Sequence, residues 1–175
     1  VLSTSREDGD LAGFYARVSE ALKDTGTYLA LVDASLRQIM NTRAPFGTPL
    51  PEITDKETAA RALASGEPAV TGVFFGRTAE RWVFNVMLPL DESHGATRLI
   101  ILSQNVEALA GALAARNLRG GWNAVIVDGE GTVVASSIGW EDVGKPFFLA
   151  AGAQPTAGVT VPVTVERDGE TYETV

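Results

Sequence analysis

The chain of 175 residues contains no cysteine and a single histidine. The absence of cysteine excludes disulfides, thiolate catalysis and thiolate metal sites. The histidine, His94, lies in a polar stretch beside Asp91 and Glu92, which favours a solvated turn residue over a metal ligand or a pH sensor. No Gly-x-Ser-x-Gly motif accompanies it, so the sequence does not predict a serine–histidine–acid triad.

Basic residues and long apolar runs are also scarce. Fourteen Lys and Arg stand against twenty-two Asp and Glu, for a net charge of −8. This balance argues against sequence-independent binding of nucleic acids, which needs a basic surface, but it says nothing of small ligands. No apolar run approaches the roughly 20 residues of a membrane-spanning helix. The apolar share of 45% is that of a globular protein with a core.

The sequence does contain an internal repeat. Leu29–Thr42 and Ala124–Ser137 align without gaps at a spacing of 95 residues, and Asp33 then matches Asp128. Each copy is an apolar run, an Asp that starts a turn, a second apolar run and a hydroxyl-rich end, which predicts a β-hairpin. In the second copy Gly131 supplies the residue that tolerates a positive φ. The two aspartates are therefore interpreted as turn-formers and not as a duplicated acidic site.

Further matches extend the repeat: Phe46–Pro49 resembles Val143–Pro146, and Glu80–Phe84 resembles Glu170–Thr174. A period near 95 residues is too long for a solenoid and predicts two small modules of one design. The first module reads as five strands and the second as four. Because the sequence starts and stops abruptly, we expect a segment of a longer protein whose second sheet is incomplete.

Local signals place the other elements. Asp10 is expected to cap a helix that Gly26 ends, and Thr54 with Glu57 forms a capping box for a second helix. A third helix is expected to be capped by Asn105. The strands are predicted at 27–33, 36–42, 69–76, 80–90, 97–104 and 159–165, with a Pro- and Gly-rich crossing at 43–51.

The order and spacing of several short motifs resemble the double Cache extracytoplasmic sensor domains, which are tandem PAS-like domains, of bacterial transmembrane histidine kinases. The motifs are Gly9–Tyr15, Val32–Asp33, Asn41–Gly47, Leu63–Gly66, Val127–Gly131, Ala135–Ser137 and Val143–Pro146. The resemblance implies an α+β fold in which a long N-terminal helix precedes two PAS-like modules with antiparallel sheets. The expected parts are an N-terminal signalling and dimer helix (1–26), a membrane-distal module (27–104), a linking helix (105–120) and an incomplete membrane-proximal module (121–175).

The resemblance also implies a context. Such segments lie in the periplasm between two membrane helices, form homodimers through the N-terminal helix, and control a cytoplasmic kinase domain. The segment itself is then expected to have no enzymatic activity and no cofactor. The residues around the second turn are consistent with the expectation of no cofactor. The Gly129–Gly131 stretch lacks the third glycine of a dinucleotide fingerprint, and the Asp128–Thr132 stretch lacks the distant Glu of a calcium loop.

A ligand site is expected on the strand at 80–90. One side of this strand, Trp82, Phe84, Val86 and Leu88, is apolar and should pack on the N-terminal helix. The other side is mixed and should face the helical crossing, where guanidinium groups would suit a carboxylate or another small anion. The candidate ligand-binding residues are Arg43, Phe75, Arg81, Asn85, Met87 and Arg98.

Alternatives remain open from the residues alone. Arg81 and Arg98 could instead be exposed and paired with Glu80, Asp91 or Glu92. Arg81–Trp82 resembles part of the amino-acid-binding cluster of double Cache domains, but its partners are not evident, so amino-acid binding is not carried over. The segment could also be a ligand-free interaction or dimerisation domain that a periplasmic partner protein reads, or the same sensor could feed a chemoreceptor or a cyclic-dinucleotide enzyme.

Overall fold

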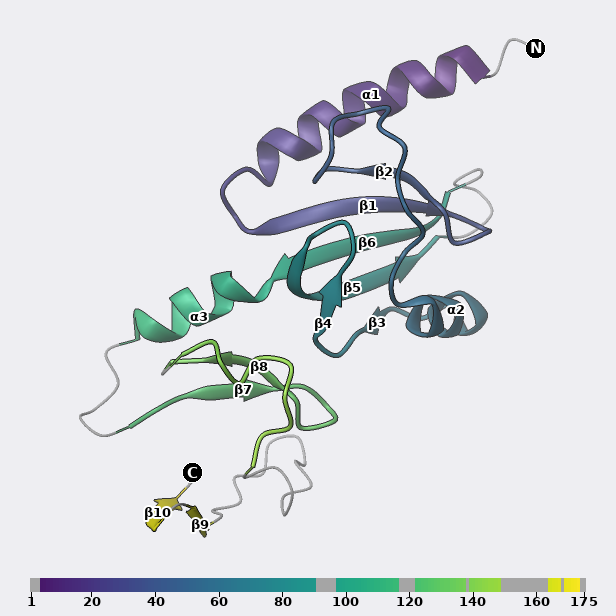
Figure 1. Cartoon of the computed structure of the whole chain (residues 1–175). Helices are drawn as coiled ribbons and strands as arrows, with labels where there is room; N and C mark the ends of the chain where they lie inside the picture. The colour runs from purple at the N-terminus through teal and green to yellow at the C-terminus, as the bar shows by residue number, and fades with distance from the viewer. Residues whose placement is uncertain are drawn as a thin grey trace.

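The computed structural model describes residues 4–90, 97–116, 122–137, 139–148, 164–167 and 169–173. Each helix is followed by two or four strands along the described chain (Figure 1), in the order α1 (Thr4–Ala21), β1 (Thr27–Asp33), β2 (Gln38–Asn41), α2 (Lys56–Ser65), β3 (Ala69–Val70), β4 (Phe74–Gly76), β5 (Arg81–Pro89), β6 (Thr97–Asn105), α3 (Val106–Ala114), β7 (Val125–Val127), β8 (Val133–Ser136), β9 (Thr164–Arg167) and β10 (Glu170–Glu173). All strand pairs are antiparallel. The expected α+β fold with antiparallel sheets is confirmed.

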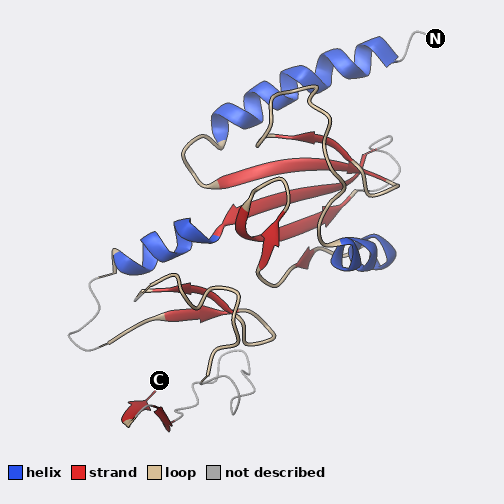
Figure 2. Ribbon diagram, in the orientation of Figure 1, coloured by secondary structure: helices blue, strands red, loops and turns tan. Residues whose placement is uncertain are grey.

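The main sheet has the strand order β2-β1-β6-β5-β3, and β4 also pairs with β5. Figure 2 shows this sheet between α1 and α2, with the long crossing between β2 and β3 passing in front. Side chains alternate across it, because successive residues of a strand point to opposite faces. On β5, Val83, Asn85 and Met87 are buried on one face, and Met87 packs in a core with Ala59 and Ala62 of α2. The mixed side of β5 therefore faces the helical crossing, as predicted.

The opposite face is covered differently from the prediction. Helix α1 packs on β1 and β2, where Leu29, Leu31 and Met40 form a core with apolar residues of the helix. Val86 and Leu88 on β5 remain 38% and 44% exposed. A helix about 10 Å wide covers roughly two strands at a spacing of about 4.8 Å, so it does not reach β5 from its place over β1. The expectation that α1 packs on the apolar side of β5 was wrong.

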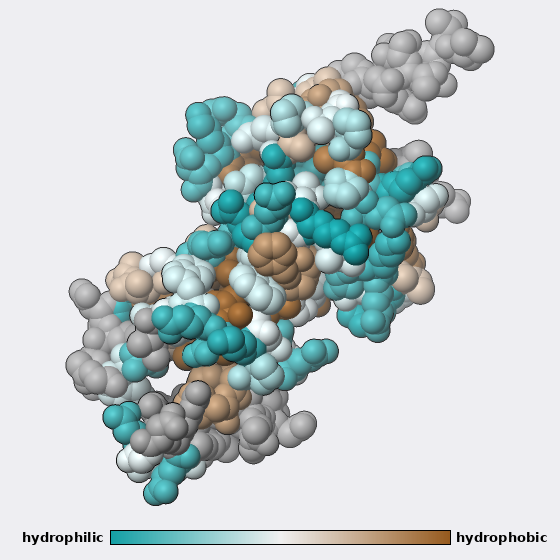
Figure 3. Space-filling model, viewed as in Figure 1, coloured by the Kyte–Doolittle hydropathy of each residue, from teal (hydrophilic) through white to brown (hydrophobic). Residues whose placement is uncertain are grey.

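The start of β5 is covered by the second hairpin instead. Val133 and Val134 of β8 form a core with Trp82 and Phe84 of β5, and α3 contributes Val106 and Leu109. In Figure 3 the brown, apolar surface of this view gathers where the sheet meets the lower hairpin. The contact is close at Gly144, where a Cβ atom would overlap the Trp82 ring. Both predicted hairpins, β1–β2 and β7–β8, are confirmed.

Several local predictions need correction. Helix α1 is already formed at Thr4, so Asp10 lies within it. Asp55, and not Thr54, caps α2, because its carboxylate accepts from the Thr58 N–H at 2.9 Å. The strand expected at 69–76 is split into β3 and β4 by Thr71, which exchanges hydrogen bonds with Asn85 through its backbone N–H and its hydroxyl. Most of the strand expected at 159–165, and the turn with His94, lie outside the described residues.

No helix in the described ranges is long and apolar enough to cross a membrane.

Candidate functional site

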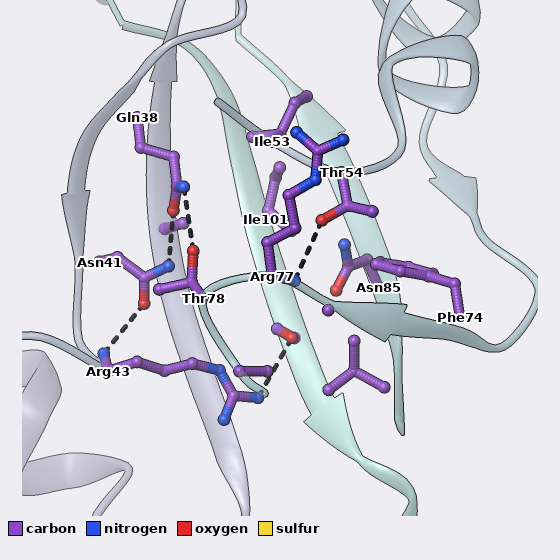
Figure 4. Close-up of a pocket in the computed structure, with 15 residues that line it drawn as sticks. Gln38, Asn41, Arg43, Ile53, Thr54, Phe74, Arg77, Thr78, Asn85 and Ile101 are labelled. Carbon is purple, nitrogen blue, oxygen red and sulfur yellow. Dashed lines mark hydrogen bonds between the residues drawn. The ribbon is translucent and has the colours of Figure 1, made fainter. Parts of the chain in front are cut away.

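A small cavity lies on the α2 side of the main sheet, under the crossing and the turn that follows β4. Its volume is about 50 Å³. This is about a third of the ~150 Å³ of an engineered cavity that binds benzene. Figure 4 shows side chains from the sheet, the crossing and the β4–β5 turn pointing into this space. The lining residues are Ala30, Gln38, Asn41, Arg43, Ile53, Thr54, Phe74, Gly76, Arg77, Thr78, Ala79, Val83, Asn85, Ile101 and Ser103.

Arg43 supplies a cation to the cavity wall. Its guanidinium carbon lies 3.8 Å from the centre of the Tyr28 ring, in cation–π geometry. Its Nη2 donates to Asn105 Oδ1 at 2.6 Å and to Ser103 Oγ at 3.3 Å. Among the residues that the structure describes, no carboxylate forms a salt bridge with it. Arg43 is therefore a partly buried positive charge whose direct contacts, with Tyr28, Ser103 and Asn105, are to neutral groups.

The surroundings of Arg43 change its acid–base behaviour. Burial lowers the pKa of Arg43 to about 10, an effect opposed by Tyr28 and by the negative charge of Glu107 and reinforced by the positive charge of Arg81. The guanidinium still carries its charge at neutral pH, but a less hydrated charge interacts more strongly with an anion. An arginine with this environment is suited to bind a carboxylate.

Asn85 presents an unused acceptor to the same cavity. Its side chain is only 8% exposed, and its Oδ1 has no hydrogen-bond partner in the described part of the chain. Its backbone is fully engaged, because the Asn85 N–H donates to Thr71 Oγ1 at 2.9 Å and its carbonyl accepts from the Thr71 N–H. A buried polar atom without a partner is unfavourable unless water or a ligand supplies a donor. Asn85 therefore indicates where a donor group of a ligand would lie.

Polar contacts hold the loops around this space. Gln38 Nε2 donates to Pro51 O at 2.7 Å and to Thr78 Oγ1 at 3.3 Å. The Arg77 N–H donates to Thr54 Oγ1 at 3.3 Å. These bonds tie the β4–β5 turn to β2 and to the crossing (Figure 4). These hydrogen bonds are exposed or only partly buried.

The six residues predicted as a site are only partly gathered here. Arg43 and Asn85 line the cavity. Met87 lies in the adjoining core at 0% exposure, and Phe75 is 55% exposed with its ring edge-on to Trp82. Arg81 is exposed and donates through Nε to the Ala79 carbonyl at 3.2 Å. The side chain of Arg98 lies outside the described residues.

The predicted site did not include the other polar residues of the lining: Gln38, Asn41, Thr54, Arg77, Thr78 and Ser103. Ser103 was within reach of the alternation argument, because it is the register partner of Asn85 on β6. Arg77 and Thr78 belong to a turn whose position depends on the Gln38 and Thr54 contacts, and no periodic signal marks it.

A larger cavity of about 770 Å³ lies between α2, the β3–β4 loop, α3 and the β7–β8 hairpin. Two carboxylates in its wall already serve the fold: Asp55 caps α2, and Asp128 Oδ2 accepts from the Val73 N–H at 3.1 Å. No group of three or more potential metal ligands occurs among the described residues. The smaller cavity is the candidate site because it combines a partly buried cation, Arg43, with the unpartnered oxygen of Asn85.

Comparisons with known proteins were made by sequence and by structure. No protein-family model matches the chain, and no curated protein matches it significantly. Solved structures do match, but their sequence identities to this chain are so low that the matches show only a shared fold. The extracellular domain of rpHK1S-Z16, a protein assigned as a histidine kinase, matches with a TM-score of 0.66 and 16% identity over 97% of this chain and 78% of that one.

Two further structures represent the kinds of protein that share the fold. The sensor domain of the Vibrio cholerae histidine kinase DctB matches with a TM-score of 0.53 and 15% identity over 77% of this chain, which spans half of that domain. The ligand-binding domain of the Pseudomonas aeruginosa amino-acid chemoreceptor PctC, in complex with GABA, matches with a TM-score of 0.55 and 20% identity over 97% of this chain and 80% of that one. The fold is therefore that of bacterial sensor domains, in agreement with the resemblance seen in the sequence.

Proposed function

We propose that this chain is the extracytoplasmic ligand-sensing segment of a transmembrane sensor histidine kinase. The observation that carries the proposal is the pairing, in one cavity, of the Arg43 cation and the unpartnered Asn85 oxygen. The fold shared with sensor domains of histidine kinases supports it. Kinase activity would then belong to a domain outside this segment.

The expected ligand is a small carboxylate that also carries a hydrogen-bond donor. Arg43 offers the positive charge, which the Glu107 carboxylate influences only through its charge, and the ligand carboxylate would provide the direct ion-pair partner that the described residues do not supply. Asn85 Oδ1 would accept from a hydroxyl or amino group of the same ligand. Since the cavity has a volume of about 50 Å³, any but the smallest acid would require the β4–β5 turn around Arg77 and Thr78 to move outward.

The proposed organisation keeps the parts expected from the sequence. Residues 1–26 would form the signalling helix and the homodimer contact, 27–104 the membrane-distal module with the cavity, 105–120 the link, and 121–175 the membrane-proximal module. The β7–β8 hairpin supports a second module of the same design, because its turn repeats the β1–β2 turn hydrogen bond for hydrogen bond. Membrane helices on both sides would anchor the segment at the periplasmic face of the inner membrane.

A second candidate is the same sensor coupled to a chemoreceptor. The likeness to the ligand-binding domain of PctC supports it as directly as the kinase likeness supports the first. The sequence that follows the second membrane helix in the complete gene distinguishes the two, because a kinase core and a methyl-accepting signalling domain have different sequence signatures.

Thermal-shift titration tests ligand binding. We expect at least one small hydroxy or amino acid to raise the melting temperature, since a ligand at 100 times its Kd adds about 2.7 kcal/mol to the free energy of unfolding. The variant Arg43→Met should lose the response. Arg37→Met is the matched control, because Arg37 is exposed and lies outside the cavity. If no organic acid or amino acid stabilises the protein, or if both variants respond like the wild type, this site is not the sensor.

A further inference from the structure

The side chain of Asn105, the residue before helix α3, does not cap the helix, although asparagine is a residue type that commonly does so. Asn105 occupies the N-cap position, with an extended backbone at φ −70° and ψ 133°, but it makes no side-chain capping hydrogen bond. An asparagine at this position normally accepts from the N–H of the second or third helical residue, here Glu107 or Ala108. The prediction that Asn105 caps this helix therefore holds for its position and fails for its side chain.

The oxygen that would form the cap is used elsewhere. Asn105 Oδ1 accepts from Arg43 Nη2 at 2.6 Å, and Asn105 is only 6% exposed. The same guanidinium forms part of the wall of the small cavity. Arg43 thus lies between the small cavity and the first turn of α3, and the Asn105 oxygen is directed at the arginine and not at the helix.

We infer that Arg43 and Asn105 form a ligand-controlled capping switch. A carboxylate in the cavity draws the Arg43 guanidinium toward itself, and the released Asn105 oxygen turns to cap α3 at Glu107 or Ala108. This inference rests on the proposed binding of a carboxylate at Arg43, and adds the route by which binding changes the linking helix. It predicts an uncapped α3 in the free protein and a capped α3 in the complex.

The packing of α3 gives the switch a consequence beyond the helix end. Val106, the first residue of α3, is 1% exposed and shares a core with Val133 and Val134 of β8, together with Leu109. A cap orders the first turn, and this turn lies on the β7–β8 hairpin. The ligand can favour the capped arrangement only as far as it binds that arrangement more tightly, and the Arg43 contact supplies this difference.

Amide hydrogen exchange measured by NMR tests the competition without any ligand. In Arg43→Met, which keeps an apolar stem but has no donors, the amides of Glu107 and Ala108 should exchange about five-fold more slowly than in the wild type, the size of effect that an N-cap produces. Asn105→Ala alone should leave their exchange unchanged, because no cap exists to be lost. The double variant should also be unchanged. Equal slowing in Arg43→Met and in the double variant overturns the switch, and so does no slowing in either.

Acetate, as the smallest carboxylate probe with a methyl group, tests the link to the ligand. In the wild type, saturating acetate should slow the same two amides to the level of Arg43→Met. Asn105→Asp should bind acetate about ten-fold more weakly, because its carboxylate forms a competing ion pair with Arg43. Asn105→Asp retains the size of asparagine, so it still tests the switch if Arg43→Met does not fold.

The outcomes separate the two proposals. Stabilisation by acetate without any change at Glu107 and Ala108 leaves the sensor function standing and overturns the switch. Slower exchange in Arg43→Met together with no binding of acetate or any other acid supports the competition for Asn105 and counts against the sensor function. Unchanged acetate affinity in Asn105→Asp also overturns the switch.

Discussion

The β1–β2 and β7–β8 hairpins use the same turn for different purposes. In each, one aspartate oxygen accepts from the N–H groups two and four residues later: Asp33 Oδ1 from Ser35 and Arg37 at 2.8 and 3.0 Å, and Asp128 Oδ1 from Glu130 and Thr132 at 3.0 and 2.9 Å. The strand ends also match, since Leu29 pairs with Thr42 and Ala124 with Ser137 through the same backbone and hydroxyl bonds. Even the register irregularity falls at equivalent positions, Leu31/Val32 and Ile126/Val127.

The two hairpins differ in the contact that the second carboxylate oxygen, Oδ2, of the aspartate makes. Asp33 Oδ2 faces solvent-exposed Arg37, with 3.6 Å between Oδ2 and Nε. Asp128 Oδ2 accepts from the N–H of Val73 at 3.1 Å, so it attaches the second hairpin to the β3–β4 loop of the main sheet. Gly72 permits this approach, since a Cβ atom there would lie against the carboxylate. The local sequence determines the turn, whereas the use of the spare oxygen depends on what packs beside it.

The glycines that follow each hairpin show the same contrast. Gly47 and Gly144 both have positive φ, at 84° and 79°. A Cβ atom on Gly47 would meet nothing within 4 Å, whereas one on Gly144 would overlap the Trp82 ring. The first site requires glycine for its backbone alone, and the second also requires it for packing between the hairpin and the sheet.

Alanine at these two glycines should give the largest difference between the copies. Gly144→Ala combines a left-handed backbone with a clash in a packed core, which together cost about 3–4 kcal/mol of unfolding free energy. Gly47→Ala has only the cost of a left-handed backbone conformation for an L-residue, about 1 kcal/mol. Urea unfolding monitored by circular dichroism measures both. A Trp82→Leu background should remove most of the extra cost at Gly144, and equal costs at the two sites would contradict the proposed contact.

The aspartates should differ less. Asp128→Asn places an amide group against an N–H donor, either that of Val73 or those of the turn, and should cost about 1.5–2 kcal/mol because a partly buried bond to a charged acceptor is lost. Asp33→Asn keeps its acceptor oxygen for the turn and loses only the exposed pair with Arg37, which contributes at most about 0.5 kcal/mol. The same unfolding experiment compares them. A cost for Asp33→Asn as large as that for Asp128→Asn would show that the contact with Val73 contributes nothing to stability.

These contrasts explain what the sequence could predict. Hairpins, turns and the inward-facing side of β5 follow from patterns within a few residues, and they brought Arg43 and Asn85 into the candidate site. The helical period of 3.6 residues in the sequence shows which face of α1 is apolar. It does not show which strands of the sheet that face covers, because this depends on the strands that lie within reach of the helix. Asn105 has the right residue type for a cap, yet its oxygen is taken by Arg43, which is distant in sequence.

The smallest expected difference concerns the left-handed residue inside each turn. It is Leu36 in the first hairpin, at φ 61°, and Gly131 in the second, at φ 80°. Gly131→Ala should cost about 1 kcal/mol, because alanine resists this conformation. Leu36→Gly should change stability by less than about 1 kcal/mol, since the strain relieved is offset by lost packing of Leu36 against the core next to α2. If Leu36→Gly instead lowers the free energy of unfolding by about 2 kcal/mol or more, the packing of Leu36, and not the turn, accounts for leucine at this position. The two turns would then share a hydrogen-bond pattern but differ in whether glycine at the left-handed position is favourable.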